Sequence, residues 1–155
     1  MRSLILTLLL SCALHPQGHP NFTGTWKQDN SKSTIRPGST IQYSKRIDQQ
    51  GQRVSVTTIL GANGERKEST NTREYTIGGE PKVTSDRERD QFTNIVKWEG
   101  DSLVFETVEK EKLAALTSRE VWTLSADNKT LTNKIHRTGG RANDSDQTYV
   151  LVKQD

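Results

Sequence analysis

Few side chains of this sequence have the type and spacing that catalysis needs. The carboxylates Asp86, Glu88 and Asp90 stand at alternate positions and could in principle supply a general acid and a general base. Arginines at positions 87 and 89 separate them, and mixed charges this close favour mutual neutralisation on a solvated turn. His136 is the one histidine beyond residue 19, and its immediate neighbours are an isoleucine and an arginine, which do not bind metals. The sequence therefore predicts no catalytic residue, no metal site, no cofactor and no enzymatic activity.

Cys12 is the only cysteine, so the chain can form no internal disulfide. The residues before this cysteine have the pattern of a signal peptide: an arginine at position 2 is followed by an apolar run at 4–10. This run is too short to cross a bilayer. Ser11, Cys12 and Ala13 have the small-x-small form that signal peptidase reads, whereas residues 9–12 resemble a loose bacterial lipobox, which would leave Cys12 lipidated. We therefore predict a signal peptide and short leader at 1–18 and a secreted or periplasmic protein. Only lipidation of Cys12 would bind it to a membrane.

The bulk composition limits the class of protein. Hydrophobic residues make up 30% of the 155 residues and the mean hydropathy is −0.79, which leaves too little apolar material for a thick helical bundle or a doubly wound sheet. The formal net charge of +3 is small, and no basic stripe interleaved with aromatic residues occurs. A nucleic-acid partner is therefore not expected.

Beyond residue 20 the chain alternates between short β-rich runs and turn signals. Within the runs apolar residues recur with a period of two, the pattern of strands with one face in a core and one in water. The turn signals lie at 50–51, 61–64, 78–79, 100–101, 127–128 and 139–140. Most are roughly ten residues apart, as in consecutive antiparallel hairpins. Residues 109–116 alone have a helix-forming composition, which fits either a helical turn or an extended hairpin loop.

This pattern predicts an all-β fold, an antiparallel up-and-down meander closed into a barrel of about eight to ten strands. A sheet of that size accumulates twist, and its edges invite pairing, so closure is favoured. A barrel also needs only one apolar face per strand, which suits the low hydrophobic content. We assign residues 21–155 to one such domain.

The hexapeptide FTGTWK at 22–27 resembles the first-strand signature of the calycins, the superfamily of lipocalins and fatty-acid-binding proteins. The resemblance implies that Gly24 permits a tight entry into the first strand and that Trp26 plugs the closed end of the barrel. SADNKTLT at 125–132 is similar to a late hairpin of the fatty-acid-binding group, and QTYVLVK at 147–153 looks like its closing strand. The resemblance implies an exported, lipocalin-like protein of the bacterial kind.

Two departures from that family bear on the ligand site. Residues 29–40 are rich in Ser, Pro and Gly, which favours a loop where fatty-acid-binding proteins carry a helical lid. The family's closing strand places an Arg two residues before a Tyr, and together they grip the ligand carboxylate. Here Gln147 stands two residues before Tyr149, so the cation is missing. Arg119 or Arg137 could replace it if its side chain faced the lumen, although arginines usually point into water.

The residues that we predict to contact a ligand are the aromatic side chains of the strands together with one arginine. They are Tyr43, Trp98, Phe105, Arg119, Trp122 and Tyr149. The tryptophans could equally be core fillers, because a barrel of this size can be packed solid or hold one small ligand. The polar residues Lys45, Asn94, Thr107 and Asn133 share the spacing of the apolar rows, which indicates either a polar, wet interior or strands shifted in register by bulges.

The sequence supports two main interpretations of function. The first is an exported barrel that binds or carries a small hydrophobic or amphipathic ligand without chemistry. The alternative is a ligand-free structural or interaction domain of the cell envelope, with a solidly packed barrel. A hydrolase or isomerase built on the same fold is a third, weaker interpretation.

Overall fold

The computed structural model describes residues 18–35, 42–61, 67–87, 90–110, 115–139 and 144–155. These residues form ten β-strands and no helix, which confirms the all-β prediction. The strands are β1 Gly24–Gln28, β2 Tyr43–Gln50, β3 Arg53–Leu60, β4 Ser69–Thr76, β5 Lys82–Arg87, β6 Asp90–Glu99, β7 Ser102–Lys110, β8 Ala115–Leu124, β9 Thr130–Gly139 and β10 Ser145–Gln154. The helical alternative for residues 109–116 is wrong at both ends of that segment, which belong to β7 and β8, while 111–114 lie outside the described residues.

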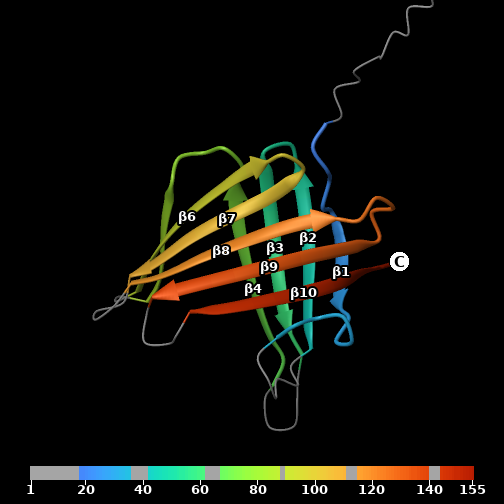
Figure 1. Cartoon of the computed structure of the whole chain (residues 1–155). Helices are drawn as coiled ribbons and strands as arrows, with labels where there is room; N and C mark the ends of the chain where they lie inside the picture. Colours follow the sequence, from blue (N-terminus) through green and yellow to red (C-terminus); the bar gives the residue numbers. More distant parts are fainter. Residues whose placement is uncertain (1–17, 36–41, 62–66, 88–89, 111–114, 140–143) are drawn as a thin grey trace, which may run out of the picture.

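All ten strands belong to one antiparallel sheet with the order β4-β3-β2-β1-β10-β9-β8-β7-β6-β5. Strands β1 to β4 pair in sequence order, and so do β5 to β10. β1 also pairs with β10, so the first and last strands join the two halves of the meander. This confirms the predicted up-and-down topology. In Figure 1, β1 to β4 stand steeply while β6 to β10 cross in front of them, so the sheet curls around an interior.

The curled sheet is left open along one side, because β4 and β5 share no ladder of hydrogen bonds within the described ranges. Near the end of β4 this side is bridged: Ile77 pairs with Val96 of β6 in parallel orientation, and the Gly78 amide donates to the Val96 carbonyl at 2.7 Å. The curled sheet is therefore closed at this point and open along the rest of the gap.

An apolar core fills the end of the barrel that contains this bridge. Its largest fully buried side chains include Trp26, Trp122 and Phe22, together with Ile47 and Leu103. Every second residue of a strand faces inward, so the alternation of the sequence becomes this core directly. The core occupies only part of the interior.

The start of β1 supports this core. Trp26 has no exposed surface, and its indole Nε1 donates a hydrogen bond to the Phe22 carbonyl at 2.9 Å. Gly24 has a φ of 151°, a region that residues with a Cβ avoid, and a Cβ built there would come within 2.7 Å of the Lys153 side chain. Glycine therefore allows the chain to turn into β1 so that Trp26 reaches the core.

Two further predictions concern the loop after β1 and the leader before it. Residues 29–35 form a turn whose Thr34 bridges to Thr148 of β10, with no helix among them, while residues 36–41 of the proposed lid-free loop lie outside the described residues. The leader at 1–17, including Cys12, also lies outside them. In the described part of the chain, no helix has the length and apolar character needed to cross a membrane.

Replacing Trp26 with alanine should lower the free energy of unfolding by about 3–5 kcal/mol, because it removes the largest fully buried side chain and leaves a cavity. Val83, on β5, is 60% exposed, and Val83→Ala should change the free energy of unfolding by less than about 0.5 kcal/mol. Urea unfolding followed by tryptophan fluorescence and circular dichroism measures both. Similar losses for the two variants would show that Trp26 does not anchor the core.

Candidate functional site

A cavity of about 380 Å³ lies inside the curled sheet, beside the apolar core. Residues of β2, β3 and β4 line it from one half of the sheet and residues of β6 to β10 from the other. Its apolar and aromatic lining residues are Tyr43, Val56, Tyr75, Phe92, Phe105, Leu116, Trp122, Ile135 and Tyr149. Its polar and charged lining residues are Lys45, Thr58, Asn71, Arg73, Thr107, Glu109, Ser118, Glu120 and Arg137.

The aromatic side chains of the lining contact one another across strands. The rings of Tyr43 and Tyr149 lie 4.5 Å apart between centroids. Phe105 contacts Tyr75 edge-on at 5.0 Å and Trp122 at 4.5 Å. Such contacts stabilise ring positions beyond the burial of area alone, so the cavity has preformed aromatic walls.

A buried ion pair occupies the boundary between this cavity and the core. Lys45 of β2, whose side chain is 5% exposed, places Nζ 3.1 Å from Oε1 of Glu120 of β8. The same oxygen accepts hydrogen bonds from Trp122 Nε1 at 2.6 Å and from Asn133 Nδ2 at 2.7 Å. The Lys45 ammonium also lies 4.6 Å from the centre of the Trp122 ring. Because β2 and β8 belong to opposite halves, the pair links the two walls.

The electrostatics of the pair keep both groups charged at neutral pH. Burial alone would raise the pKa of Glu120, but the charge of Lys45 and the hydrogen bonds from Trp122 and Asn133 outweigh it and lower the pKa below its usual value. Burial alone would likewise lower the pKa of Lys45, but the charge of Glu120 and the contact with Tyr43 raise it above its usual value. Burial also raises the pKa of Tyr43. The interior therefore contains a fixed dipole.

A second polar group lies on β9 and β10. Arg137 lines the cavity and donates through Nη1 to Gln147 Oε1 at 3.2 Å, and the Tyr149 hydroxyl donates to the same oxygen at 3.2 Å. On β4, Arg73 lies 5.3 Å from the ring centre of Phe92. Arginines therefore reach the cavity from both halves of the sheet.

Further hollows adjoin the barrel. One of about 620 Å³ follows the gap between β4 and β5, and it shares Arg73 and Tyr75 with the main cavity. Another of about 480 Å³ lies beside His19 and Trp98 at the end where the chain enters β1. Neither brings together as many inward-facing strands as the main cavity does.

Four of the six residues predicted to contact a ligand line the main cavity: Tyr43, Phe105, Trp122 and Tyr149. Trp98 instead stacks on His19 at 4.2 Å and packs beside Phe22, so it covers the end of the core. This corrects its predicted position.

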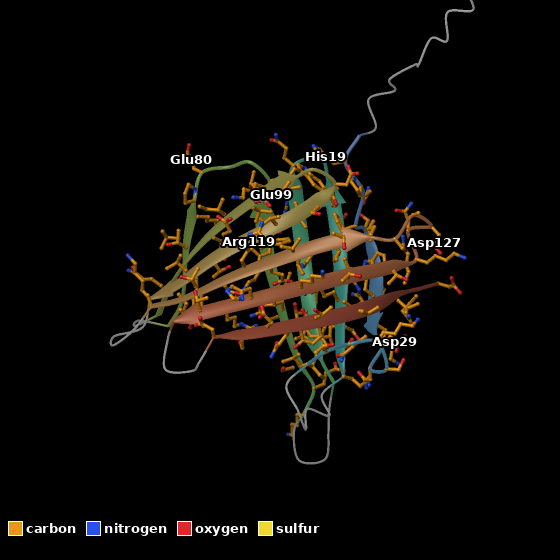
Figure 2. All side chains as sticks on the ribbon, in the orientation of Figure 1. His19, Asp29, Glu80, Glu99, Arg119 and Asp127 are labelled. Carbon is orange, nitrogen blue, oxygen red and sulfur yellow. The ribbon has the colours of Figure 1, made fainter. Side chains whose placement is uncertain are left out.

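Arg119 lies on the outer face, the usual position for an arginine, so it does not take the lumen position that its candidate ligand contact requires. It forms ion pairs with Glu99 (Figure 2) and with Glu106. Its side chain is 42% exposed. On β8 the neighbouring Glu120 faces inward, and alternation along the strand sends Arg119 the other way. Arg137, the other arginine considered, is the one that reaches the cavity.

The polar residues of the apolar rows indeed face the interior. Lys45, Asn94 and Asn133 are buried, and Thr107 donates to Asn94 Oδ1 at 3.0 Å. The register of the β2–β3, β6–β7 and β8–β9 ladders is unbroken through these positions. The polar-interior interpretation is therefore correct, and displaced register does not explain them.

Two buried amides of this interior are incompletely hydrogen-bonded. Among the described residues, neither Oε1 nor Nε2 of Gln28 has a partner, and Asn133 Oδ1 has none. Unpaired buried polar atoms destabilise a fold unless water or a ligand satisfies them. These amide atoms are therefore available for hydrogen bonds with groups other than the described side chains.

The sequence-based reasoning missed Glu120 and Arg73 as lining residues. Glu120 is two positions before Trp122, so the period of two that placed Trp122 inside also places Glu120 there. The same period links Arg73 to Tyr75 on β4. The alternation was not applied to Glu120 and Arg73 because charged side chains generally face water.

Candidates for catalysis or metal binding do not converge in the described part of the structure. His136 lies on the outer face, where Nδ1 is 2.8 Å from Asp146 Oδ1. No group of three or more His, Cys, Asp or Glu side chains in the described ranges could hold a metal ion. The side chains of Asp86, Glu88 and Asp90 lie outside the described residues.

Comparisons with known proteins identify the fold. No protein-family model matches the sequence, and no curated protein matches it either. Among solved structures, the REP1-NXSQ fatty acid transporter is similar with a TM-score of 0.60 and 13% identity, over 86% of this chain and 96% of that one. Lipid binding protein 8 of Caenorhabditis elegans has a TM-score of 0.60 and 16% identity, over 86% and 95% of the two chains.

A third similar structure is secretory abundant heat soluble protein 4 from Ramazzottius varieornatus, with a TM-score of 0.60 and 11% identity, over 89% of this chain and 97% of that one. At identities this low the likeness establishes the fold and nothing further. The fold of this chain is thus similar to that of a fatty acid transporter, a lipid binding protein and a secretory abundant heat soluble protein.

Acid should remove the stabilisation that the Lys45–Glu120 pair provides. Because folding lowers the pKa of Glu120, its contribution is complete above the unfolded value of 4.5 and disappears as the pH falls through the lower folded value. Glu120→Gln should lower the free energy of unfolding at pH 7 by about 3 kcal/mol, since Lys45 loses its buried counter-charge. Below pH 4.5 the difference from the unmodified protein should shrink.

Urea unfolding at a series of pH values between neutral and strongly acidic measures this difference. Glu106→Gln, which removes a carboxylate from the outer face, serves as the control and should have a small effect at every pH. A constant difference between Glu120→Gln and the unmodified protein across the series would contradict the account.

Proposed function

We propose that the protein binds a small amphipathic ligand inside the barrel, with an acidic group near Arg137 and an apolar part against the aromatic walls. The observation that carries the proposal is the cavity of about 380 Å³ lined by both aromatic and charged side chains. Its volume falls in the lower part of the range for small-molecule sites, roughly 300–1,000 Å³.

The charges of the lining favour an anionic ligand. Among the described lining residues, three are cationic, Lys45, Arg73 and Arg137, and two are carboxylates, Glu109 and Glu120. One positive charge is therefore in excess inside a cavity with apolar walls, where charge interactions are stronger than in water. Arg137 and the Tyr149 hydroxyl both already orient toward Gln147 Oε1, so a carboxylate near them could accept hydrogen bonds from both.

The fold comparison supports the same ligand class. Two of the similar structures are named as a fatty acid transporter and a lipid binding protein. Their likeness to this chain concerns the fold, so the ligand proposal depends on the cavity itself.

The proposal also includes that the protein is exported and that it binds its ligand without catalysing a reaction. The leader at 1–18 would direct the chain out of the cytoplasm, to secretion or to the periplasm, with Cys12 as an anchor if it is lipidated. Binding without catalysis is supported by the position of His136 on the outer face, away from the cavity. The cavity argues against the alternative of a solidly packed, ligand-free barrel.

Replacing Arg137 with glutamine should weaken binding of dodecanoic acid by about tenfold, because a charge-assisted hydrogen bond to the carboxylate is lost. Binding of 1-dodecanol, which has no negative charge, should change little. Displacement of a fluorescent naphthalene sulfonate probe measures both affinities. Arg119→Gln is the matched control, since this arginine lies on the outer face.

Equal weakening in the two arginine variants would overturn the placement of the acidic group. A lack of binding by every probe, together with native mass spectrometry that finds no small molecule on protein from its natural source, would overturn the proposed function itself.

A further inference from the structure

The carboxylate of Glu120 uses only one of its two oxygens. Lys45 Nζ, Trp122 Nε1 and Asn133 Nδ2 all donate to Oε1, at 2.6 to 3.1 Å. Oε2 accepts no hydrogen bond from the described residues, and the Glu120 side chain keeps 23% of its surface exposed. Because Glu120 lines the cavity, its accessible oxygen faces the space that a ligand would occupy.

An ionised carboxylate in this position demands hydrogen-bond donors. Each carboxylate oxygen can accept about two hydrogen bonds, and leaving such a group unpaired in an apolar site is destabilising. Water can satisfy Oε2 in the empty cavity. A ligand that displaces this water must supply a donor of its own or lose affinity.

The register of β8 and β9 fixes how this acceptor lies relative to the cation of the proposed acid site. Glu120 pairs with Ile135, and Arg137, two residues further along β9, pairs with Ser118. Two residues along a strand span about 7 Å. The backbones at these two diagonal positions lie about 7–8 Å apart. The cavity therefore presents an acceptor and a cationic donor at neighbouring inward positions.

We propose that Glu120 is a specificity-determining residue, which selects ligands that carry a hydroxyl or N–H donor several carbon atoms from their acidic group. This inference rests on the proposed ligand-binding function and defines its ligand class more narrowly: hydroxylated or nitrogen-bearing amphipathic acids are preferred to acids with a plain hydrocarbon chain. The acidic group binds at Arg137, and the donor forms a hydrogen bond with Glu120 Oε2.

The two roles of Glu120 involve different oxygens and can be separated. Oε1 holds the interior together through Lys45, Trp122 and Asn133, and this role would affect all ligands alike. Oε2 would affect only ligands that carry a donor. A change in the ratio of affinities for two matched ligands therefore reports on Oε2, whereas a parallel change in both reports on the structure.

The test compares dodecanoic acid with 6-hydroxydodecanoic acid by isothermal titration calorimetry on the full mature chain. The unmodified protein should bind the hydroxylated acid about tenfold more tightly, since a hydrogen bond to a charged acceptor distinguishes the two. Glu120→Gln replaces the charged acceptor by a neutral amide, so this preference should fall several-fold, because hydrogen bonds to an ionised group are stronger than neutral ones. Glu106→Gln, on the outer face, should retain it.

The comparison in the unmodified protein is decisive even if Glu120→Gln fails to fold. Equal affinity for the two acids, or a preference for the plain acid, overturns the role of Glu120 while leaving the proposed binding function in place. A preference that is undiminished in folded Glu120→Gln also overturns it. Binding of neither acid overturns both proposals together.

Discussion

The buried ion pair between Lys45 and Glu120 is the constraint on which the interior depends. Two charges placed at inward positions of a barrel cannot be covered by hydrocarbon alone without a large desolvation penalty. The structure meets this by pairing them at 3.1 Å and directing the Trp122 and Asn133 side chains to the same oxygen. Since β2 and β8 lie in opposite halves of the sheet, the pair also fixes the distance between the two walls, and a cavity remains beside it.

This constraint divides the interior into two parts. The apolar part, which contains Phe22, Trp26 and Leu103, holds the strands together where the gap between β4 and β5 is bridged. The polar part contains the cavity and the ion pair, and the Asn133 side chain that donates to Glu120 leaves its own Oδ1 without a partner among the described residues. The low hydrophobic content of the sequence, 30%, follows from this arrangement, because only part of one face of the sheet is packed with apolar residues.

The fold could be predicted from sequence because its determinants are local. Alternation sets the inward face of each strand, and glycines such as Gly51 and Gly100, both with positive φ, mark hairpin turns. The site was predicted only in part. Aromatic residues are expected to face the interior, whereas charged residues are expected to face water even where they line a cavity. The difference between Arg119 and Arg137 illustrates this: alternation from Trp122 sends the first outward, and alternation from Ile135 sends the second inward. The pairing of Lys45 with Glu120 joins residues 75 apart and could not be deduced from local pattern.

The most direct test of the account is to locate a bound ligand in the protein and so to establish whether it lies inside the barrel. In nuclear magnetic resonance spectra of the protein with bound dodecanoic acid, intermolecular Overhauser effects should connect the methylene protons of the ligand with the ring protons of Tyr75 and Phe105, which line the cavity. Cross-peaks confined to outward side chains, such as Val152, would show that the ligand lies on the surface and would contradict the account.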